Sequence, residues 1–355
     1  MTDLQKGEKG VPTTLVVGGA GFLGSHLCDR FIREGHEVIC MDSLLTGQME
    51  NIRHLLSHAR FVFIRHDVTQ PIDWSSLIRD KVDNHDALKI DYVLHLAAPD
   101  DPEDYMRHRI HTLKIGALGC YHTLGLAKAH GSVFLLASTP EVYEGPQAKT
   151  YRGRVSPPGP RRTYDEAKRF VESIATAYYR EHNVKVRIAR IFNTYGARMP
   201  VGDEQSLPSF VVQALQGRPL TIHGDGRQTR SYCYVSDLVE GLYRLLLSQE
   251  TEPVDLGNPG EFSVLKLAET IIELTGSESR VVFEPRTVSE PVRSRPDIAK
   301  AREALNWYPR IGLFEGIKRV IPYFRVQMAD RWLHHPELGW RVPFHAVDER
   351  YVQNN

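Results

Sequence analysis

The 355-residue sequence lacks the marks of several large classes of protein. Its 44 basic side chains balance its 44 acidic ones, so no net charge attracts nucleic acid or an anionic membrane. No apolar run is long enough to span a bilayer, and the opening stretch MTDLQKGEKGVPT has no apolar signal-peptide core. We therefore expect a soluble, cytoplasmic protein that binds neither nucleic acid nor membranes.

Cysteine is scarce as well. The sequence has neither a CxxC pair nor the spacing of a metal site among its four cysteines, which are Cys28, Cys40, Cys120 and Cys233. We expect small buried side chains in a reducing compartment, and no metal ion.

A glycine-rich turn near the N-terminus is the first positive feature. The run 14–17, TLVV, indicates a buried strand that the turn joins to a helix-like stretch, SHLCDRFIREG. Gly18 permits the tight turn, Gly21 lets backbone N–H groups approach a pyrophosphate, and Gly24 lets helix and strand pack closely. The next strand ends on Asp42, placed to accept from both ribose hydroxyls and to repel a 2′-phosphate. This order predicts a site for NAD rather than NADP.

Strand-like runs recur along the first half of the chain, at 14–17, 37–42, 61–65, 92–97, 132–137 and 186–191. Helix-like segments separate most of them, which predicts an α/β fold: a Rossmann-type doubly wound parallel sheet. Shorter strands and helices follow and indicate a smaller C-terminal α/β substrate lobe. The predicted domains are 1–192 for NAD binding, mainly 193–325 for the substrate, and a tail at 326–355.

A tyrosine stands one helical turn before a lysine, at Tyr164 and Lys168. On one helix face the ammonium lowers the phenol's pKa from about 10 towards neutrality, which makes the phenolate a usable base. Hydride transfer out of an alcohol needs such a base, and Thr139 offers a hydroxyl to share the proton. Taken alone, such a pair more often lies on a solvated helix face. The dinucleotide-binding start favours the catalytic interpretation.

Six ordered motifs carry a family resemblance: GGAGFLGSHL, HLAAP, ASTPEVY, YDEAKR, RIFNTYG and QTRSYCYVSDL. Together they resemble the extended short-chain dehydrogenases that act on nucleotide sugars. Within that family, GPRRTYDEAKR, ARIFNTYGARM and ALQGRPLTIHGDGRQTR are most similar to the UDP-glucuronate decarboxylases. The resemblance implies NAD as cofactor, UDP-glucuronate as substrate and CO2 and UDP-xylose as products. It also implies a homodimer, because relatives pair through helices matching 104–129 and 164–182 into a four-helix bundle.

The resemblance implies a role for each site residue. Tyr164 would take the proton of the sugar C4 hydroxyl, Lys168 would support it and hold the cofactor ribose, and Thr139 would bond the same oxygen. Glu141 would orient or exchange protons near C5, with a solvated surface carboxylate as its alternative. The matching cofactor positions are Gly18, Gly21, Phe22, Leu23, Gly24, Asp42, Asp67, Val68, Leu96 and Ala97, together with Tyr164 and Lys168.

Three further positions match those expected around the diphosphate and sugar: Asn193, Arg198 and Arg230. Arginine suits this role because its planar fork pairs bidentately with phosphate or carboxylate. For Arg198 and Arg230, the alternative is an arginine that is only solvated at the surface.

The sequence departs from the family at four positions. Pro140 replaces a hydroxyl residue, Gly116 an asparagine, and Gln205 and Ser294 each an arginine. These departures lie toward the sugar end, so other outcomes stay open: a 4-epimerase, a 4,6-dehydratase, or a decarboxylase that releases the 4-keto sugar. A protein that binds NAD and a partner without catalysis is the alternative from another class, and the intact Thr139, Tyr164 and Lys168 disfavour it.

Overall fold

A computed structural model describes residues 10–82, 88–99, 104, 107–143, 162–200, 206–285 and 293–334. The chain divides into two compact units. The first comprises 1–192, 239–256 and 298–308, and the second comprises 193–238, 257–297 and 309–355. The second unit is thus discontinuous in sequence, whereas we expected one substrate lobe made mainly of residues 193–325.

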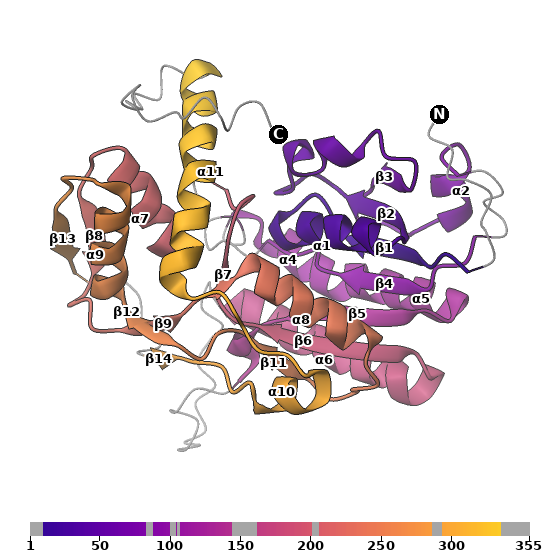
Figure 1. Ribbon diagram of the computed structural model, residues 1–355. Coiled ribbons are helices and arrows are strands. Elements are labelled where there is room, and N and C mark those ends of the chain that lie inside the picture. Colours follow the sequence, from indigo (N-terminus) through magenta and orange to yellow (C-terminus); the bar gives the residue numbers. More distant parts are fainter. Residues whose placement is uncertain are drawn as a thin grey trace. The chain divides into compact units, whose positions relative to one another are not determined.

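The first unit is built on a seven-stranded sheet in the order β11-β6-β5-β4-β1-β2-β3 (Figure 1). All its neighbouring strands pair in parallel, which confirms the predicted α/β Rossmann-type fold. The strands are β1 (Thr13–Val17), β2 (Glu37–Asp42), β3 (Phe61–Arg65), β4 (Tyr92–His95), β5 (Val133–Ser138), β6 (Lys185–Ile191) and β11 (Val254–Leu256). Strand order reverses between β1 and β4, and ligands of such sheets bind beyond the carboxyl ends of the strands at that point.

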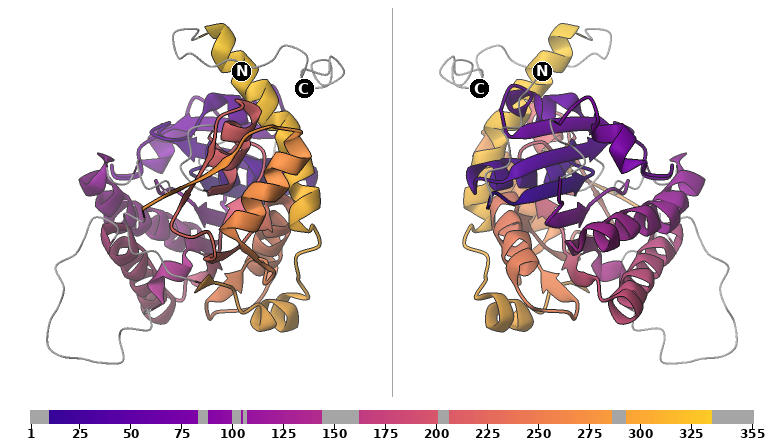
Figure 2. Two further views of the ribbon diagram at one scale, coloured as in Figure 1. Left: turned by 90° about the vertical axis from the view of Figure 1, so that its left-hand side faces the viewer. Right: turned by 90° about the vertical axis from the view of Figure 1, so that its right-hand side faces the viewer.

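Helices cover this sheet and connect its strands. They are α1 (Phe22–Arg33), η1 (Met49–Asn51), η2 (Arg53–Leu55), α2 (Trp74–Ile78), α4 (Arg109–Lys114), the π-helical turn η4 (Ile115–Gly119), α5 (Cys120–His130), η5 (Pro140–Val142), α6 (Arg162–His182), α8 (Val235–Leu247, within the unit from Val239) and α10 (Ala299–Leu305). α5 and α6 lie side by side (Figure 2).

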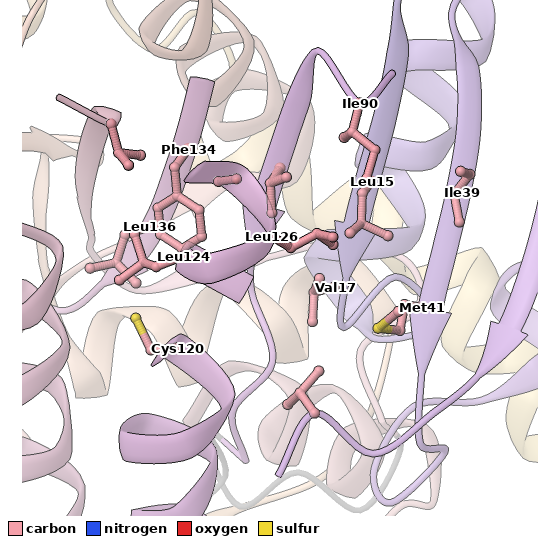
Figure 3. Close-up of a cluster of buried hydrophobic side chains, with 14 of the residues drawn as sticks. Leu15, Val17, Ile39, Met41, Ile90, Cys120, Leu124, Leu126, Phe134 and Leu136 are labelled. Carbon is pink, nitrogen blue, oxygen red and sulfur yellow. The ribbon is translucent and has the colours of Figure 1, made fainter. Parts of the chain in front are cut away.

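The core lies between the sheet and these helices (Figure 3). Alternate strand residues point into it, such as Leu15 and Val17 of β1, while the intervening Val16 is equally buried on the other face. Burial on both faces explains why central strands such as β1 (TTLVV) and β5 (VFLLAS) are largely apolar and do not alternate with charged residues.

The helix expected over 104–129 is present with one irregularity, the π-helical turn η4. A Cβ at Gly119 would lie 2.8 Å from Val68 Cγ2, so glycine lets the widened turn pack closely on the loop after β3. The apolar spacing of 164–182 predicts one buried helix face made of Ala167, Phe170, Val171, Ile174 and Tyr178. Ala167 and Val171 are buried, but Phe170 is 48 % exposed. The placement of Phe170 on the buried face of α6 is therefore wrong.

The second unit contains three small sheets, with strand orders β10-β7, β12-β9-β14 and β13-β8. Its strands are β7 (Thr194–Tyr195), β8 (Leu220–His223), β9 (Thr229–Ser231), β10 (Cys233–Tyr234), β12 (Glu261–Ser263), β13 (Val281–Glu284) and β14 (Arg293–Ser294). Its main helices are α7 (Ser206–Leu215), α9 (Val264–Thr275) and α11 (Leu313–His334). The expected tail from 326 begins inside α11, and 335–355 lie outside the described residues.

All four cysteines are free and buried, as predicted. Within the described ranges, no helix has both the length and the apolar character needed to cross a membrane. The same ranges contain no cluster of three or more side chains suited to a metal ion.

Candidate active site

The turn after β1 requires glycine at two positions. Gly18 has a φ of +81°, and a Cβ there would lie 2.8 Å from the Ala97 nitrogen. A Cβ at Gly24 would collide with the Gly18 carbonyl group. α1 then begins with Gly21 as its N-cap and without a side-chain cap. Its first-turn N–H groups form a site for phosphate oxygens, so this cradle fits the pyrophosphate of a dinucleotide. The structure brings together the predicted positions Gly18, Gly21, Phe22, Leu23 and Gly24.

The Asp42 carboxylate lies at the end of β2, against the same turn. It accepts hydrogen bonds from the Ala20 N–H (2.9 Å) and the Leu44 N–H (2.8 Å). Burial raises the pKa of Asp42, and the two backbone bonds offset part of that rise. Asn51 Nδ2 also donates to the Ala20 carbonyl at 2.9 Å. Asp42 and Asn51 therefore fix the turn, a structural function that the sequence analysis did not anticipate. The ribose contact of Asp42 stays a prediction.

The loop after β3 carries the next predicted cofactor positions. Asp67 Oδ1 accepts from the Thr69 N–H at 2.9 Å, and its Oδ2 lies 3.5 Å from His111 Nε2. Val68 is buried, and its carbonyl oxygen lies 2.8 Å from His122 Nδ1. Helices α4 and α5 thus hold this loop in place.

The segment after β4 approaches the glycine-rich turn. The Leu96 N–H donates to the Val17 carbonyl at 2.9 Å, which extends the β1–β4 ladder by one bond. Ala97 follows, with its nitrogen facing Gly18. The predicted cofactor residues after β1, β2, β3 and β4 therefore all lie at the carboxyl edge of the sheet, beside the reversal in strand order.

Tyr164 and Lys168 lie in the first two turns of α6. The Lys168 ammonium is buried, donates to the Ala137 carbonyl at 2.9 Å, and lies 5.4 Å from the centre of the Tyr164 ring. This anchors the pair to β5 just before Thr139. The solvated-face interpretation of the pair is wrong for Lys168, which is only 9 % exposed.

Thr139 and Glu141 contact each other in the turn after β5. The Thr139 hydroxyl donates to the Glu141 carboxylate, and it also caps the turn by accepting from the Glu141 N–H at 3.4 Å. Pro140 stands at the first position of this 3₁₀ turn. Its fixed φ is close to the helical value, and the N–H that it lacks would have no partner within the turn. The proline that departs from the family pattern is therefore compatible with the local backbone.

A network that the sequence analysis missed supports this turn. Arg190 pairs bidentately with Glu172, at 3.0 and 2.7 Å, and the Ser138 hydroxyl donates to Glu172 at 2.5 Å. The pairing with Glu172 raises the pKa of Arg190 above its ordinary value. The Arg190 guanidinium also stacks on Tyr143, 4.5 Å from the ring centre, and the Tyr143 hydroxyl donates to Asp255 at 2.7 Å. Glu172 lies four residues after Lys168 on α6, which places both on one helix face but gives no signal for the partner of Glu172 on β6.

The three predicted substrate residues lie in the second unit. The Asn193 carbonyl accepts from the Cys233 N–H at 2.9 Å. Arg198 has a φ of 70°, and its backbone N–H donates to the Tyr323 hydroxyl. Arg230 is 9 % exposed and donates from Nη1 to the Thr229 carbonyl at 2.9 Å. The solvated interpretation is therefore wrong for Arg230.

Arg230 lies in the middle strand of the β12-β9-β14 sheet. Its register partners are Phe262 and Ser294. Two positions that the sequence analysis singled out separately, Arg230 and Ser294, thus face each other across one ladder. Gln205, the remaining arginine replacement, lies outside the described residues.

The comparisons with known proteins agree with this geometry. The model of the "NAD dependent epimerase/dehydratase family" matches residues 14–257. UDP-glucuronic acid decarboxylase 1 of Arabidopsis thaliana is 47 % identical over 88 % of this chain and 69 % of its own length. UDP-glucuronic acid decarboxylase 1 of Danio rerio is 44 % identical over 95 % of this chain and 77 % of its own length.

Among solved structures, UDP-glucuronic acid 4-epimerase from Bacillus cereus, in complex with UDP-glucuronic acid and NAD, is similar at 26 % identity. Its TM-score is 0.75, with 89 % of this chain and 99 % of that chain covered. The family resemblance and the NAD cofactor expected from the sequence are confirmed. The chain belongs to the NAD dependent epimerase/dehydratase family.

Proposed function

We propose that this protein is a UDP-glucuronate decarboxylase that converts UDP-glucuronate to UDP-xylose and CO2. The observation that carries the proposal is the identity of 47 % to a decarboxylase over 88 % of the chain. The geometry of the first unit supports the oxidation step, because Lys168 holds the Tyr164 helix against the strand end that carries Thr139 and Glu141.

The glycine cradle and the acids beside it would hold the cofactor. The turn at Gly18–Gly24 would take the pyrophosphate, with Asp42 at the ribose and Asp67 at the adenine. Bound NAD supplies a hydride acceptor at the sugar C4, and in its reduced form a donor that returns the hydride.

The chain's own residues would manage the protons. Tyr164 takes the proton of the C4 hydroxyl, and Lys168 stabilises the phenolate by its positive charge. Thr139 bonds the same oxygen, for which its hydroxyl must turn from Glu141 toward the sugar. Glu141, thereby released, orients or exchanges protons near C5.

Carbonyl chemistry then accounts for the loss of CO2. A ketone at C4 makes the C5 carboxylate a β-keto acid, so the bond from C5 to the carboxylate breaks and its electron pair forms an enolate. A proton added at C5 restores the ketone, and reduction at C4 gives UDP-xylose. No net oxidation occurs over the cycle.

The second unit would supply substrate contacts. Asn193, Arg198 and Arg230 are the proposed residues, with the arginines facing the diphosphate or sugar carboxylate. The near-complete burial of Arg230 supports a specific role, because a buried guanidinium needs anionic or carbonyl partners.

A 4-epimerase is the second candidate. It is supported by the likeness to the Bacillus cereus 4-epimerase, with a TM-score of 0.75. A 4,6-dehydratase is less well supported, since such enzymes usually pair two acids after the threonine and this chain has Pro140 and Glu141.

We also propose a homodimer, formed by α4–α5 and α6 of two copies. Large apolar side chains are exposed on these helices, including Ile110 (73 %), Tyr121 (54 %) and Phe170 (48 %). Exposed apolar side chains on adjacent helices mark an interaction surface. A four-helix bundle with two-fold symmetry needs the same helices from a second copy of the chain, so we propose that a second copy covers this surface. Phe170→Glu should shift sedimentation from dimer to monomer, while Lys185→Glu, an exposed change on β6, should not.

A cytoplasmic location completes the proposal, supported by four free thiols. The function is tested by incubating the purified protein with UDP-glucuronate and NAD. CO2 and UDP-xylose are expected, whereas a C4-epimerised sugar without CO2 would favour the second candidate.

A further inference from the structure

A row of polar side chains crosses three strands near the carboxyl edge of the sheet in the first unit. Ser138 of β5, Arg190 of β6 and Asp255 of β11 are register partners in this parallel sheet. Register partners on neighbouring strands project from the same face of a sheet. This is the face that α6 covers, because Glu172 of α6 bonds both Ser138 and Arg190. The polar row, made of Ser138, Arg190 and Asp255, therefore packs against the helix that carries Tyr164.

Arg190 stands at the centre of the polar row. Its Nε and Nη2 donate to the Glu172 carboxylate at 3.0 and 2.7 Å, and the two side chains are only 19 % and 13 % exposed. A bidentate pair of this kind fixes the plane of the guanidinium. The Tyr143 ring packs on that plane, with its centre 4.5 Å from the guanidinium carbon. Arginine suits this position because lysine has neither the planar fork nor a flat surface for stacking.

Tyr143 is held by the polar row at its hydroxyl end as well. The hydroxyl donates to Asp255 Oδ1 at 2.7 Å. Burial raises the pKa of Tyr143, so the hydroxyl keeps its proton and stays a donor. The side chain is 48 % exposed, and little core packing would hold it without these contacts. Arg190 and Asp255 together therefore fix the position of Tyr143.

The polar row is linked to both ends of the turn that carries Thr139 and Glu141. Ser138 directly precedes Thr139, and Tyr143 follows Glu141 by two residues. The residues between these ends form a single 3₁₀ turn, which is too short to have a core of its own. Arg190 is connected to the first end through the carboxylate that it shares with Ser138, and to the second end through the Tyr143 ring. One guanidinium thus controls the position of both ends.

We propose that Arg190 and Tyr143 are positioning residues for the turn at 139–143. They set where Thr139 meets the sugar C4 oxygen and where Glu141 lies relative to C5. A turn that is released at one end would hold the C4 ketone less firmly, so the ketone would leave more often before the hydride returns. The kinetic part rests on the proposed function, because it requires this turn to face the sugar.

Tyr143 is the better position for a test. A substitution of Arg190 leaves a buried carboxylate unpaired and can unfold the protein, whereas Tyr143 is half-exposed. Tyr143→Leu removes both the stacked ring and the hydroxyl, while Tyr143→Phe keeps the ring on Arg190 and removes only the bond to Asp255. The matched control is Tyr179→Leu, because Tyr179 is a tyrosine of similar exposure, 41 %, on α6.

The kinetic readout is the ratio of released UDP-4-keto-pentose to UDP-xylose. Only folded enzyme makes either product, so a loss of stability alone leaves this ratio unchanged. Tyr143→Leu should raise the ratio about 2–5-fold, which is the factor expected from the loss of a cation–π contact at a partly exposed site. Tyr143→Phe should raise it less, and Tyr179→Leu should keep the wild-type ratio. An unchanged ratio in Tyr143→Leu would overturn the proposal, and so would an equal rise in Tyr179→Leu.

The position of the turn is tested independently of the reaction, in crystal structures of the wild-type protein and of Tyr143→Leu, each with NAD. In the variant, Thr139 Oγ1 should move by at least about 0.5 Å relative to Tyr164 Oη, which is the tolerance of a productive site. A turn that stays in place in the variant would overturn the proposal. If the wild type releases no CO2, the proposed function fails, and the crystal structures alone decide this inference.

Discussion

Gly24→Ala tests the cofactor cradle with a change of one methyl group. The added Cβ would lie 2.8 Å from both the Gly18 carbonyl carbon and the Gly19 Cα. These are backbone atoms of the turn, which cannot rotate aside as a side chain would. Overpacking typically costs about 1–3 kcal/mol, and we expect the upper end here.

The same shift should weaken NAD binding. Moving the turn misaligns backbone N–H groups that would contact the pyrophosphate, and a hydrogen bond to a charged group contributes about 1.5–3 kcal/mol. Loss of one such bond corresponds to a roughly 10–150-fold increase in the Kd for NAD.

Gly125→Ala is the matched control. Gly125 lies inside α5, and a Cβ there would have no atom within 4 Å. Replacing glycine by alanine in a helix interior gains about 0.8–1 kcal/mol, so this variant should be slightly more stable and bind NAD normally.

Chemical unfolding followed by circular dichroism gives the stability of each variant, and calorimetry gives the Kd for NAD. Opposite signs of the two stability changes are expected. If Gly24→Ala were as stable as the wild type and bound NAD equally well, the assignment of this turn as the pyrophosphate site would be refuted.

Three further predictions concern the site itself. Asp42→Ala should weaken NAD binding and reduce the protein's preference for NAD over NADP. Equal affinities of the wild type for NAD and NADP, measured by calorimetry, would contradict this. Tyr164→Phe should lower the rate of C4 oxidation about 10²–10⁴-fold with NAD binding almost intact, and a wild-type rate of NADH formation in single turnover would remove Tyr164 as the base. The wild type should release some UDP-4-keto-pentose and leave NADH behind, because Pro140 supplies no hydroxyl to the ketone. Pro140→Ser should reduce the fraction of product released as UDP-4-keto-pentose. If the wild type released only UDP-xylose, this prediction would be refuted.

Local patterns predicted the strands of the sheet well. Apolar runs bounded by turns coincide with β2 and β3, with β1 to within one residue and with β4 to within two. The glycines after β1 could also be interpreted, because each serves the geometry of one short turn. The strand β11 was not predicted, since three residues carry little local signal and its pairing with β6 joins distant segments.

Side-chain partners were less predictable. The pairing of Arg190 with Glu172 depends on how α6 lies on β6, and no sequence spacing fixes that arrangement. The exposure of Phe170 could not be inferred from helical periodicity alone, because the pattern does not distinguish a core face from a face that another chain would cover.

Mass spectrometry of the nucleotide sugar made from UDP-glucuronate in the presence of NAD distinguishes decarboxylation from epimerisation. We predict a product lighter by one CO2, chromatographically identical to UDP-xylose, with Tyr164→Phe as the inactive control. A product of unchanged mass that separates from UDP-glucuronate as its C4 epimer would contradict it.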